Sequence, residues 1–350
     1  MAGFGFRIAL NNGRLPANFK ISPPPPRSLR QVRARGTLVH EQRHDGTDIP
    51  SGKPPACRSK LSLEIDRILV MDEKSDRVDA ACPLVVNKDH NAPSVFRPEG
   101  LLREARRQKR LPLAAVPKIC VLDPDGDVVR YIKRKEIGCI HGGWACYHTE
   151  LLVFDLDDVE EVGIVGCAVG APFAVLVAEQ LFASGCRLII SVTSAGQITP
   201  IGPMPYFILI DRAVRDEGTS YHYLPPATFA EAPDSVLLID AEQELLRLTG
   251  ISVHRGPTWT TDAPYRETEA AIASARNLGA LAVEMEAAAL YAFANAARRS
   301  IICFAHVTNA MAQTEGDFEK GEADGTPATL AVVAAAIRAW SASGRTSDFA

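Results

Sequence analysis

This sequence has no uninterrupted apolar run near 20 residues, so it is not expected to contain a membrane-spanning helix. It also has no Cys-x-x-Cys pair among its eight cysteines. Four potential metal ligands lie close together in the chain: Cys139, His141, Cys146 and His148. They lack the paired spacing of a structural zinc site, so no metal is expected. Several cysteines lie within apolar segments, where a thiol acts as a small hydrophobic group, which favours a reduced, cytoplasmic setting.

Acidic residues are scarce at the start of the chain, where none precedes Glu41. The first 60 residues hold 11 Lys and Arg against 3 Asp and Glu, a surplus of 8 positive charges. They also contain Pro23 to Pro26 and no apolar periodicity, so they cannot bury enough surface to offset their conformational entropy. We expect residues 1–90 to form a disordered, basic, Pro-rich extension. Its origin is open between a transit peptide, a nucleic-acid-binding arm and non-functional upstream sequence from a wrong start codon.

The rest of the chain is acidic, because the whole chain has a formal net charge of −4 despite the basic start. An enzyme that acts on nucleic acid would present a basic face instead, so no nucleic-acid partner is expected. We expect a single folded domain over residues 91–345.

Short β-type runs alternate with helical stretches from Ile119 onward. The predicted strands are Ile119–Leu122, Leu151–Phe154, Glu161–Val165, Leu188–Val192, Phe207–Ile210, Ser252–His254, Ala280–Val283 and Ile301–Val307. The predicted helices are 101–109, 171–184, 240–249, 267–277, 286–298 and 327–341. This alternation predicts an α/β fold with a mostly buried sheet and helices on both sides. Polar loops follow several of these strands, at 193–197, 216–222, 260–266, 284–286 and 308–310, so a ligand site is expected at the strand ends.

The segment Val283-Glu284-Met285-Glu286-Ala287 is the most informative motif. Two carboxylates flank a methionine where a buried strand gives way to an Ala-rich helix. Carboxylates are favoured at a helix start by its free N–H groups and dipole, and they can also accept hydrogen bonds from a vicinal diol. The motif therefore indicates either a sugar-binding pair or a helix cap.

Four further motifs accompany this segment in a fixed order. They are Gly166-Cys167-Ala168-Val169-Gly170-Ala171-Pro172, Thr193-Ser194-Ala195-Gly196, Arg215 to Tyr223, and Thr260-Thr261-Asp262-Ala263-Pro264-Tyr265. Over residues 115–340 the set resembles the nucleoside phosphorylase family, which includes purine nucleoside and uridine phosphorylases and the methylthioadenosine/adenosylhomocysteine nucleosidases. The resemblance implies a three-layer α/β/α domain with a central mixed, partly barrel-like sheet, a homo-oligomer (trimer or hexamer), and no metal or organic cofactor.

The resemblance also assigns roles to the Glu-Met-Glu segment. It implies that Glu286 accepts hydrogen bonds from the ribose hydroxyls of a small-molecule nucleoside. Met285 would lie against the sugar face and Glu284 would assist.

Two other groups of residues receive roles in the same way. The Thr193 loop would contact phosphate through Ser194 and the base near Gly196, although its residues also fit a plain strand-end turn. Asp262 and Tyr265 would lie beside the base, with core packing as the alternative for Tyr265.

His222 could titrate near neutral pH, although a lone histidine is more often structural.

The sequence departs from the family at two places. The phosphate-binding turn keeps Asp123-Pro124 but loses its glycine and arginine, and Ser191 replaces a second arginine. Losing two charge-assisted bonds weakens phosphate binding by about 3–6 kcal/mol, unless Arg130, Arg215 or a neighbouring subunit's arginine substitutes. The acid of purine-cleaving members is replaced by Asn309, which can hydrogen-bond a base edge but is no general acid.

Three functions follow as hypotheses. Phosphorolysis of a nucleoside to free base and ribose 1-phosphate, with phosphate as co-substrate, is the commonest chemistry of the family and is predicted first. Hydrolysis, with a carboxylate such as Asp125 positioning water, fits the missing arginines. A nucleoside-binding protein without turnover fits the missing acid.

Overall fold

The computed structural model describes residues 82–156, 161–311 and 315–344. Most of the predicted disordered extension, up to residue 81, lies outside the described residues. Within these ranges no helix is long and apolar enough to cross a membrane. The predicted domain boundary at residue 90 stays a prediction.

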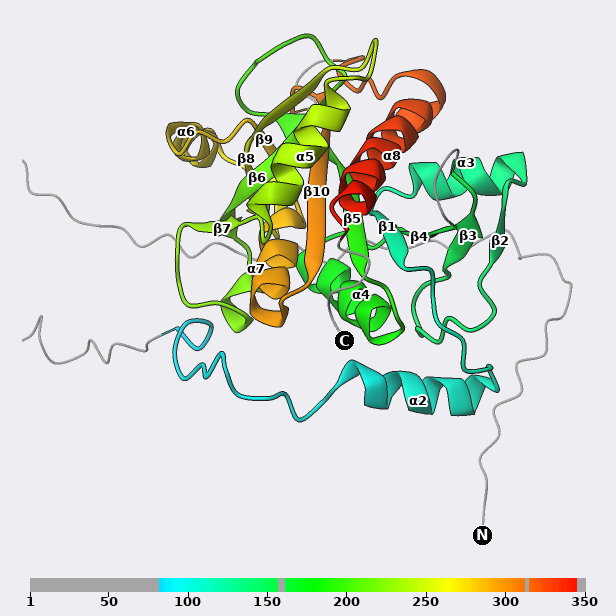
Figure 1. Ribbon diagram of the computed structural model, residues 1–350. Helices are drawn as coiled ribbons and strands as arrows, with labels where there is room; N and C mark the ends of the chain where they lie inside the picture. The colour runs from blue at the N-terminus through cyan, green and yellow to red at the C-terminus, as the bar shows by residue number, and fades with distance from the viewer. Residues whose placement is uncertain (1–81, 157–160, 312–314, 345–350) are drawn as a thin grey trace, which may run out of the picture. The chain divides into compact units, whose positions relative to one another are not determined.

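The strands of the described chain join one ten-stranded sheet (Figure 1). In chain order they are β1 (Ile119–Asp123), β2 (Gly138–Ile140), β3 (Leu152–Phe154), β4 (Val162–Gly166), β5 (Leu188–Gln197), β6 (Tyr206–Asp216), β7 (Phe229–Glu231), β8 (Val253–Thr261), β9 (Ala282–Glu284) and β10 (Ser300–Asn309). The helices are α2 (Pro98–Lys109), α3 (Asp127–Lys135), α4 (Ala171–Ala183), α5 (Ser235–Leu245), α6 (Glu269–Asn277), α7 (Ala287–Ala297) and α8 (Thr326–Ala342). Short 3-10 turns are η1 (Ser220–His222), η2 (Pro264–Arg266) and η3 (Glu322–Gly325).

One part of the sheet closes on itself. β5, β10, β6, β8 and β9 pair in a ring, because β10 pairs with both β6 and β5 and β9 pairs back onto β5. The remaining main strands continue outward from β5 in the order β1, β4, β3 and β2. β10, β5, β1 and β4 are parallel neighbours, so their carboxyl ends meet at one edge. The predicted mixed, partly barrel-like sheet is confirmed.

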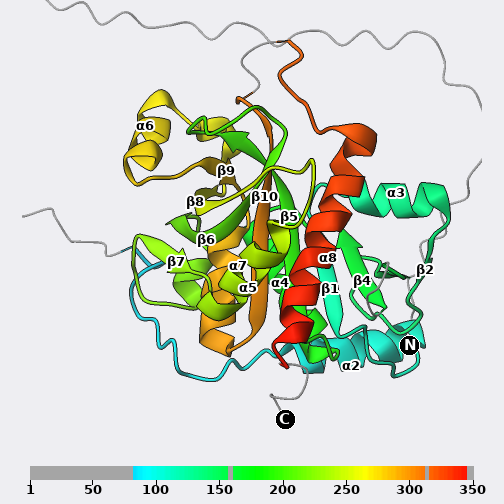
Figure 2. The same ribbon diagram turned by 45° about the horizontal axis from the view of Figure 1, so that its top comes forward.

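Helices cover both faces of this sheet. Side chains of β5 alternate between two cores: Ile189 packs in the core beneath α4 and α7, while Leu188 and Ile190 pack in the core beneath α5 and α8. This is the period of two expected of a strand buried on both faces. Figure 2 shows α8 crossing the sheet beside β1 and β5. The three-layer α/β/α prediction is therefore confirmed.

Several predicted boundaries differ from the structure. β6 and β8 extend well beyond the predicted 207–210 and 252–254, because both continue through the ring. α5 begins at Ser235, five residues before the prediction, since the Asp234 carboxylate accepts the N–H groups of Val236 and Leu237 and so caps the helix there. α3, β2 and β7 were not predicted.

The polar segment 193–197 is also different from expectation. Its residues lie within β5, which runs through Gln197, and do not form a loop. Thr193 and Ser194 pair in register with Ala305 and His306 of β10. Pairing between β5 and β10 therefore fixes the positions of Thr193 and Ser194.

Candidate active site

Glu284 ends β9 and is almost completely buried. Its Oε1 accepts hydrogen bonds from the hydroxyls of Thr258, at 3.1 Å, and Thr260. Its Oε2 accepts the N–H groups of Glu286 and Ala287, both at 2.7 Å. Four donors leave little acceptor capacity for a sugar, so in this structure Glu284 caps α7 and ties it to β8. Burial raises the pKa of Glu284 above its usual value.

Glu286 sits at the start of α7 with 1% of its surface exposed. Its Oε1 accepts the N–H of Gly170 at 2.7 Å, whereas its Oε2 has no hydrogen-bond partner. Burial, reinforced by the charge of Glu284, raises the pKa of Glu286 to about 8. A buried acceptor without a partner is costly, so this oxygen is poised to receive a donor from a ligand. Met285 is half-buried between the two carboxylates.

The sequence motifs assigned no functional role to Gly170. It begins α4 with φ of 90°, a conformation that glycine adopts without strain. This turn aims its N–H at Glu286, which lies 116 residues away in sequence. The Gly-rich turn before α4 and the Glu-Met-Glu segment are thus parts of one site.

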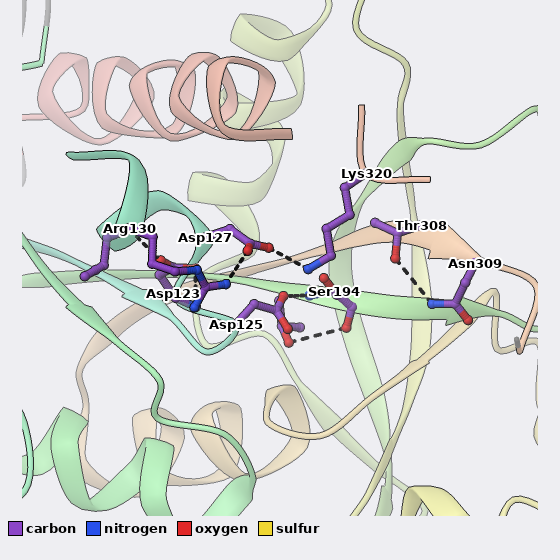
Figure 3. Close-up of polar contacts among 11 residues, drawn as sticks. Asp123, Asp125, Asp127, Arg130, Ser194, Thr308, Asn309 and Lys320 are labelled. Carbon is purple, nitrogen blue, oxygen red and sulfur yellow. Dashed lines mark hydrogen bonds and ion pairs between the residues drawn. The ribbon is translucent and has the colours of Figure 1, made fainter. Parts of the chain in front are cut away.

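The end of β5 brings two hydroxyl residues to the same place. The hydroxyl of the buried Thr193 lowers the pKa of Glu286 through a side-chain hydrogen bond, and it also lies 3.4 Å from the Ser194 carbonyl oxygen. The N–H of Ser194 donates to Asp125 Oδ2 at 2.8 Å (Figure 3). The backbone N–H of Ser194, the residue expected to contact phosphate, is therefore already bound to the Asp125 carboxylate.

Three aspartates lie where β1 leads into α3: Asp123 ends the strand, Asp125 lies in the turn and Asp127 begins the helix. Asp123 is buried and accepts the N–H groups of Gly126 at 3.1 Å and Val129 at 2.9 Å, so it fixes the start of α3. Burial, with the charges of Asp125 and Asp127 adding to it, raises the pKa of Asp123 to about 6. The turn is rigid and acidic.

The cations near this turn are already paired. Asp127 binds Arg130 and also Lys320, the latter at 2.5 Å (Figure 3). Arg215 is buried elsewhere and donates to Ser220 Oγ and to the carbonyls of Leu224 and Pro225. Both guanidinium groups are engaged in these contacts. In this structure neither Arg130 nor Arg215 is therefore free to replace the lost phosphate arginines, contrary to the expectation from the sequence.

Asn309 ends β10 and pairs with Gly196 of β5. Its Nδ2 donates to the carbonyl of Ala195 at 3.4 Å and to Thr308 Oγ1 at 3.3 Å, and its Oδ1 accepts the N–H of Met311 at 3.0 Å. The atoms nearest to a Cβ built on Gly196 belong to Met311, Val283 and Asn309. This side of the site is therefore lined by a thioether, an isopropyl group and an amide.

The remaining predicted residues lie on two segments: His222 in η1 after β6, and Asp262 and Tyr265 after β8. Asp262 is exposed and accepts the N–H of Gly218 at 2.8 Å. His222 Nδ1 lies 3.1 Å from Lys88 Nζ, and burial lowers the pKa of His222. Tyr265 is 99% exposed, so the alternative that it packs in the core is wrong. None of the hydrogen bonds found for these three residues joins them to Glu286 or Ser194.

Metal binding has no support in the described ranges, which contain no group of three or more His, Cys, Asp or Glu side chains able to hold an ion.

The fold and the strand-end carboxylates define an α/β protein of the nucleoside phosphorylase type. The crystal structure of uridine phosphorylase from Vibrio fischeri ES114 aligns with a TM-score of 0.53 and 21% identity, over 64% of this chain and 91% of that chain. Its complex with 6-hydroxy-1-naphthoic acid aligns with a TM-score of 0.54 and 20% identity. At these identities the likeness shows the shared fold.

The sequence places the chain in a family. Residues 118–338, well over half of the chain, match the phosphorylase superfamily. The chain belongs to that superfamily.

Curated relatives carry phosphorylase names. The chain is 29% identical over 131 residues to the DeoD-type purine nucleoside phosphorylase of Streptococcus pyogenes serotype M5, covering 37% of this chain and 55% of the relative. It is 31% identical over 134 residues to the DeoD-type enzyme of Myxococcus xanthus, covering 38% and 56%. It is 26% identical over 140 residues to the guanosine phosphorylase of Halorubrum lacusprofundi, covering 39% and 56%. The chain thus spans about half the length of these relatives.

Proposed function

We propose that this protein cleaves the N-glycosidic bond of a nucleoside. The observation that carries the proposal is the unpartnered Oε2 of Glu286, a buried acceptor held in place by the Gly170 N–H. A ribose hydroxyl would supply the missing donor. As the bond to the base breaks, positive charge grows on the sugar ring, and a carboxylate beside it stabilises that charge. Glu286 is the residue we assign to both tasks.

The nucleophile that the geometry favours is water. Asp125 accepts the Ser194 N–H, and its charge acts on Glu286, so it lies beside the expected sugar position. A carboxylate there can accept a proton from an attacking water. A phosphate dianion would have to displace Asp125 from Ser194, and both nearby cations are bound to Asp127. We therefore propose hydrolysis to free base and ribose, with Asp125 as general base.

Phosphorolysis to free base and ribose 1-phosphate is the second candidate. It was the leading prediction from the sequence, and the names of the curated relatives support it. It requires that Lys320 or Arg130 leave Asp127 for phosphate, or that a neighbouring subunit supply an arginine.

The setting of the enzyme is also a proposal. The seven cysteines in the described part of the chain are free thiols, which supports a reduced, cytoplasmic compartment. We propose a homo-oligomer that acts on a small-molecule nucleoside. Light scattering coupled to size exclusion would give the subunit number, and a monomer at assay concentration would contradict this part of the proposal.

Base release is the direct test of bond cleavage. The purified protein would be incubated with inosine, adenosine, guanosine, uridine and methylthioadenosine, with and without phosphate, and free base followed by chromatography. At pH 9, where the Glu286 carboxyl is ionised, Glu286→Gln should lower turnover at least about 100-fold, since it removes the charge beside the developing cation. Glu244→Gln, which alters only surface ion pairs with Arg247 and Arg338, should not. No release by the wild type from these five nucleosides or from the positively charged 7-methylguanosine would refute the proposed activity.

A further inference from the structure

The base side of the site has no acid at the position where a leaving base needs one. Asn309 carries no titratable proton, and both ends of its amide are engaged by Ala195, Thr308 and Met311. The other atoms closest to a Cβ built on Gly196 belong to Met311 and Val283. A neutral purine leaves as an anion unless an acid protonates it, and such protonation contributes about 10²–10⁴-fold in rate.

One carboxyl does contact this strand end. Asp317 Oδ1 accepts the N–H of Ala310, the residue after Asn309. Asp317 is therefore the alternative candidate for the acid that protonates the leaving base, and the experiment below tests it.

The sugar side of the site has an excess of carboxylates. Glu286 has an unpartnered buried Oε2, Asp125 binds the N–H of Ser194 in β5, and Asp123 ends the neighbouring strand β1. The two cations at this edge, Arg130 and Lys320, are both neutralised by Asp127. Neither Asp125 nor Glu286, once Glu286 has lost its proton, is paired with a cation in the described residues, so this space favours a ligand with a positive charge.

We propose that the substrate is a nucleoside whose base carries a fixed positive charge, such as an N-alkylated purinium or a pyridinium riboside. This inference rests on the proposed function, because it presumes cleavage of the N-glycosidic bond. When that bond breaks, its electron pair passes to the cationic ring nitrogen system and the base leaves neutral. Water forms the new bond to the sugar carbon and its proton passes to Asp125. No proton has to reach the base, so an amide at position 309 suffices.

The test compares two purines that differ in charge. kcat/KM would be measured for 7-methylguanosine, which is cationic, and for guanosine and 1-methylguanosine, which are neutral, after subtracting the uncatalysed rates. 1-Methylguanosine controls for the size of the added methyl group. The wild type is expected to prefer 7-methylguanosine by at least about 100-fold. In Asn309→Asp, which introduces a carboxyl at the base, the ratio should fall by at least about 10-fold through faster cleavage of guanosine.

The outcomes are distinct. Similar kcat/KM values for 7-methylguanosine and guanosine in the wild type would overturn the inference and leave the proposed function standing. Slower guanosine cleavage in Asp317→Asn, with 7-methylguanosine unchanged, would also overturn it, because Asp317 would then be the acid. Failure to cleave either compound would refute the proposed function itself. The wild-type ratio needs no variant, so poor folding of Asn309→Asp does not remove the test.

Discussion

Replacing Glu286 by glutamine is expected to stabilise the protein above neutral pH. The folded-state pKa of Glu286 is raised to about 8 from its usual 4.5, so the folded protein holds a proton that the unfolded chain releases. Below about pH 4.5 the Glu286 carboxyl is protonated in both states and does not lower the free energy of unfolding. As the pH rises from 4.5 toward 8, the unfolded chain releases this proton and the free energy of unfolding falls. A glutamine stays neutral throughout this window and can still accept the Gly170 N–H.

The size of the effect follows from proton linkage. Each pH unit between the two pKa values costs about 1.4 kcal/mol of unfolding free energy, so wild type loses about 2 kcal/mol between pH 6 and pH 8. For a domain of this size, that corresponds to about 4–8 °C in Tm. The Glu286→Gln variant lacks this contribution, so its Tm should fall less over the same interval.

The assay is calorimetry or thermal fluorescence at several pH values, with Glu284→Gln as the matched variant. Glu284 accepts four hydrogen bonds, and an amide nitrogen would face two of the donors. Glu284→Gln is therefore expected to lose about 2–4 kcal/mol at pH 6, and less at pH 8, because removing the Glu284 charge lowers the pKa of Glu286. If Glu286→Gln and wild type instead show the same change in Tm between pH 6 and pH 8, the reasoning about Glu286 is wrong.

Three further predictions concern other residues. Asp125→Asn should reduce base release in phosphate-free buffer at least about 100-fold, because an amide cannot accept the proton of water; chromatography that shows unchanged turnover would exclude Asp125 as the base. Arg215→Lys should destabilise the protein by about 2–4 kcal/mol in urea unfolding, since an ammonium cannot make the three bonds of the guanidinium, and a loss below about 0.5 kcal/mol would contradict this role. Gly325→Ala should unfold at a clearly lower temperature than Gly250→Ala: both positions have positive φ, but only the new methyl at 325 would lie 2.3 Å from His306 Cε1. Equal melting temperatures would contradict that contact.

Much of the fold follows from local sequence patterns. The short apolar runs that became β1, β4 and β10 were predicted within one or two residues, and the Ala-rich run predicted the buried helix α7. α3 was missed because its start depends on the buried Asp123, whose capping role is not visible in a charged stretch that resembles a surface turn. The closed ring depends on pairing between strands far apart in sequence, which the resemblance supplied and local patterns do not encode.

The site was predicted less completely than the fold. The sequence predicted a site at Glu284 and Glu286, but the different contacts of the two glutamates depend on which donors surround each one. Glu284 receives Thr258 and Thr260 from β8, whereas Glu286 receives Gly170 and Thr193. Those donors come from segments that tertiary structure alone brings together.

The measurement that tests the central claim most directly is the identity of the sugar product. The wild type would be incubated with 7-methylguanosine and with inosine in buffer containing phosphate, and the products followed by phosphorus and proton NMR. The account predicts base release with free ribose, at a rate that phosphate does not increase. Ribose 1-phosphate as the main sugar product, or base release only when phosphate is added, would contradict the claim that water attacks beside Asp125.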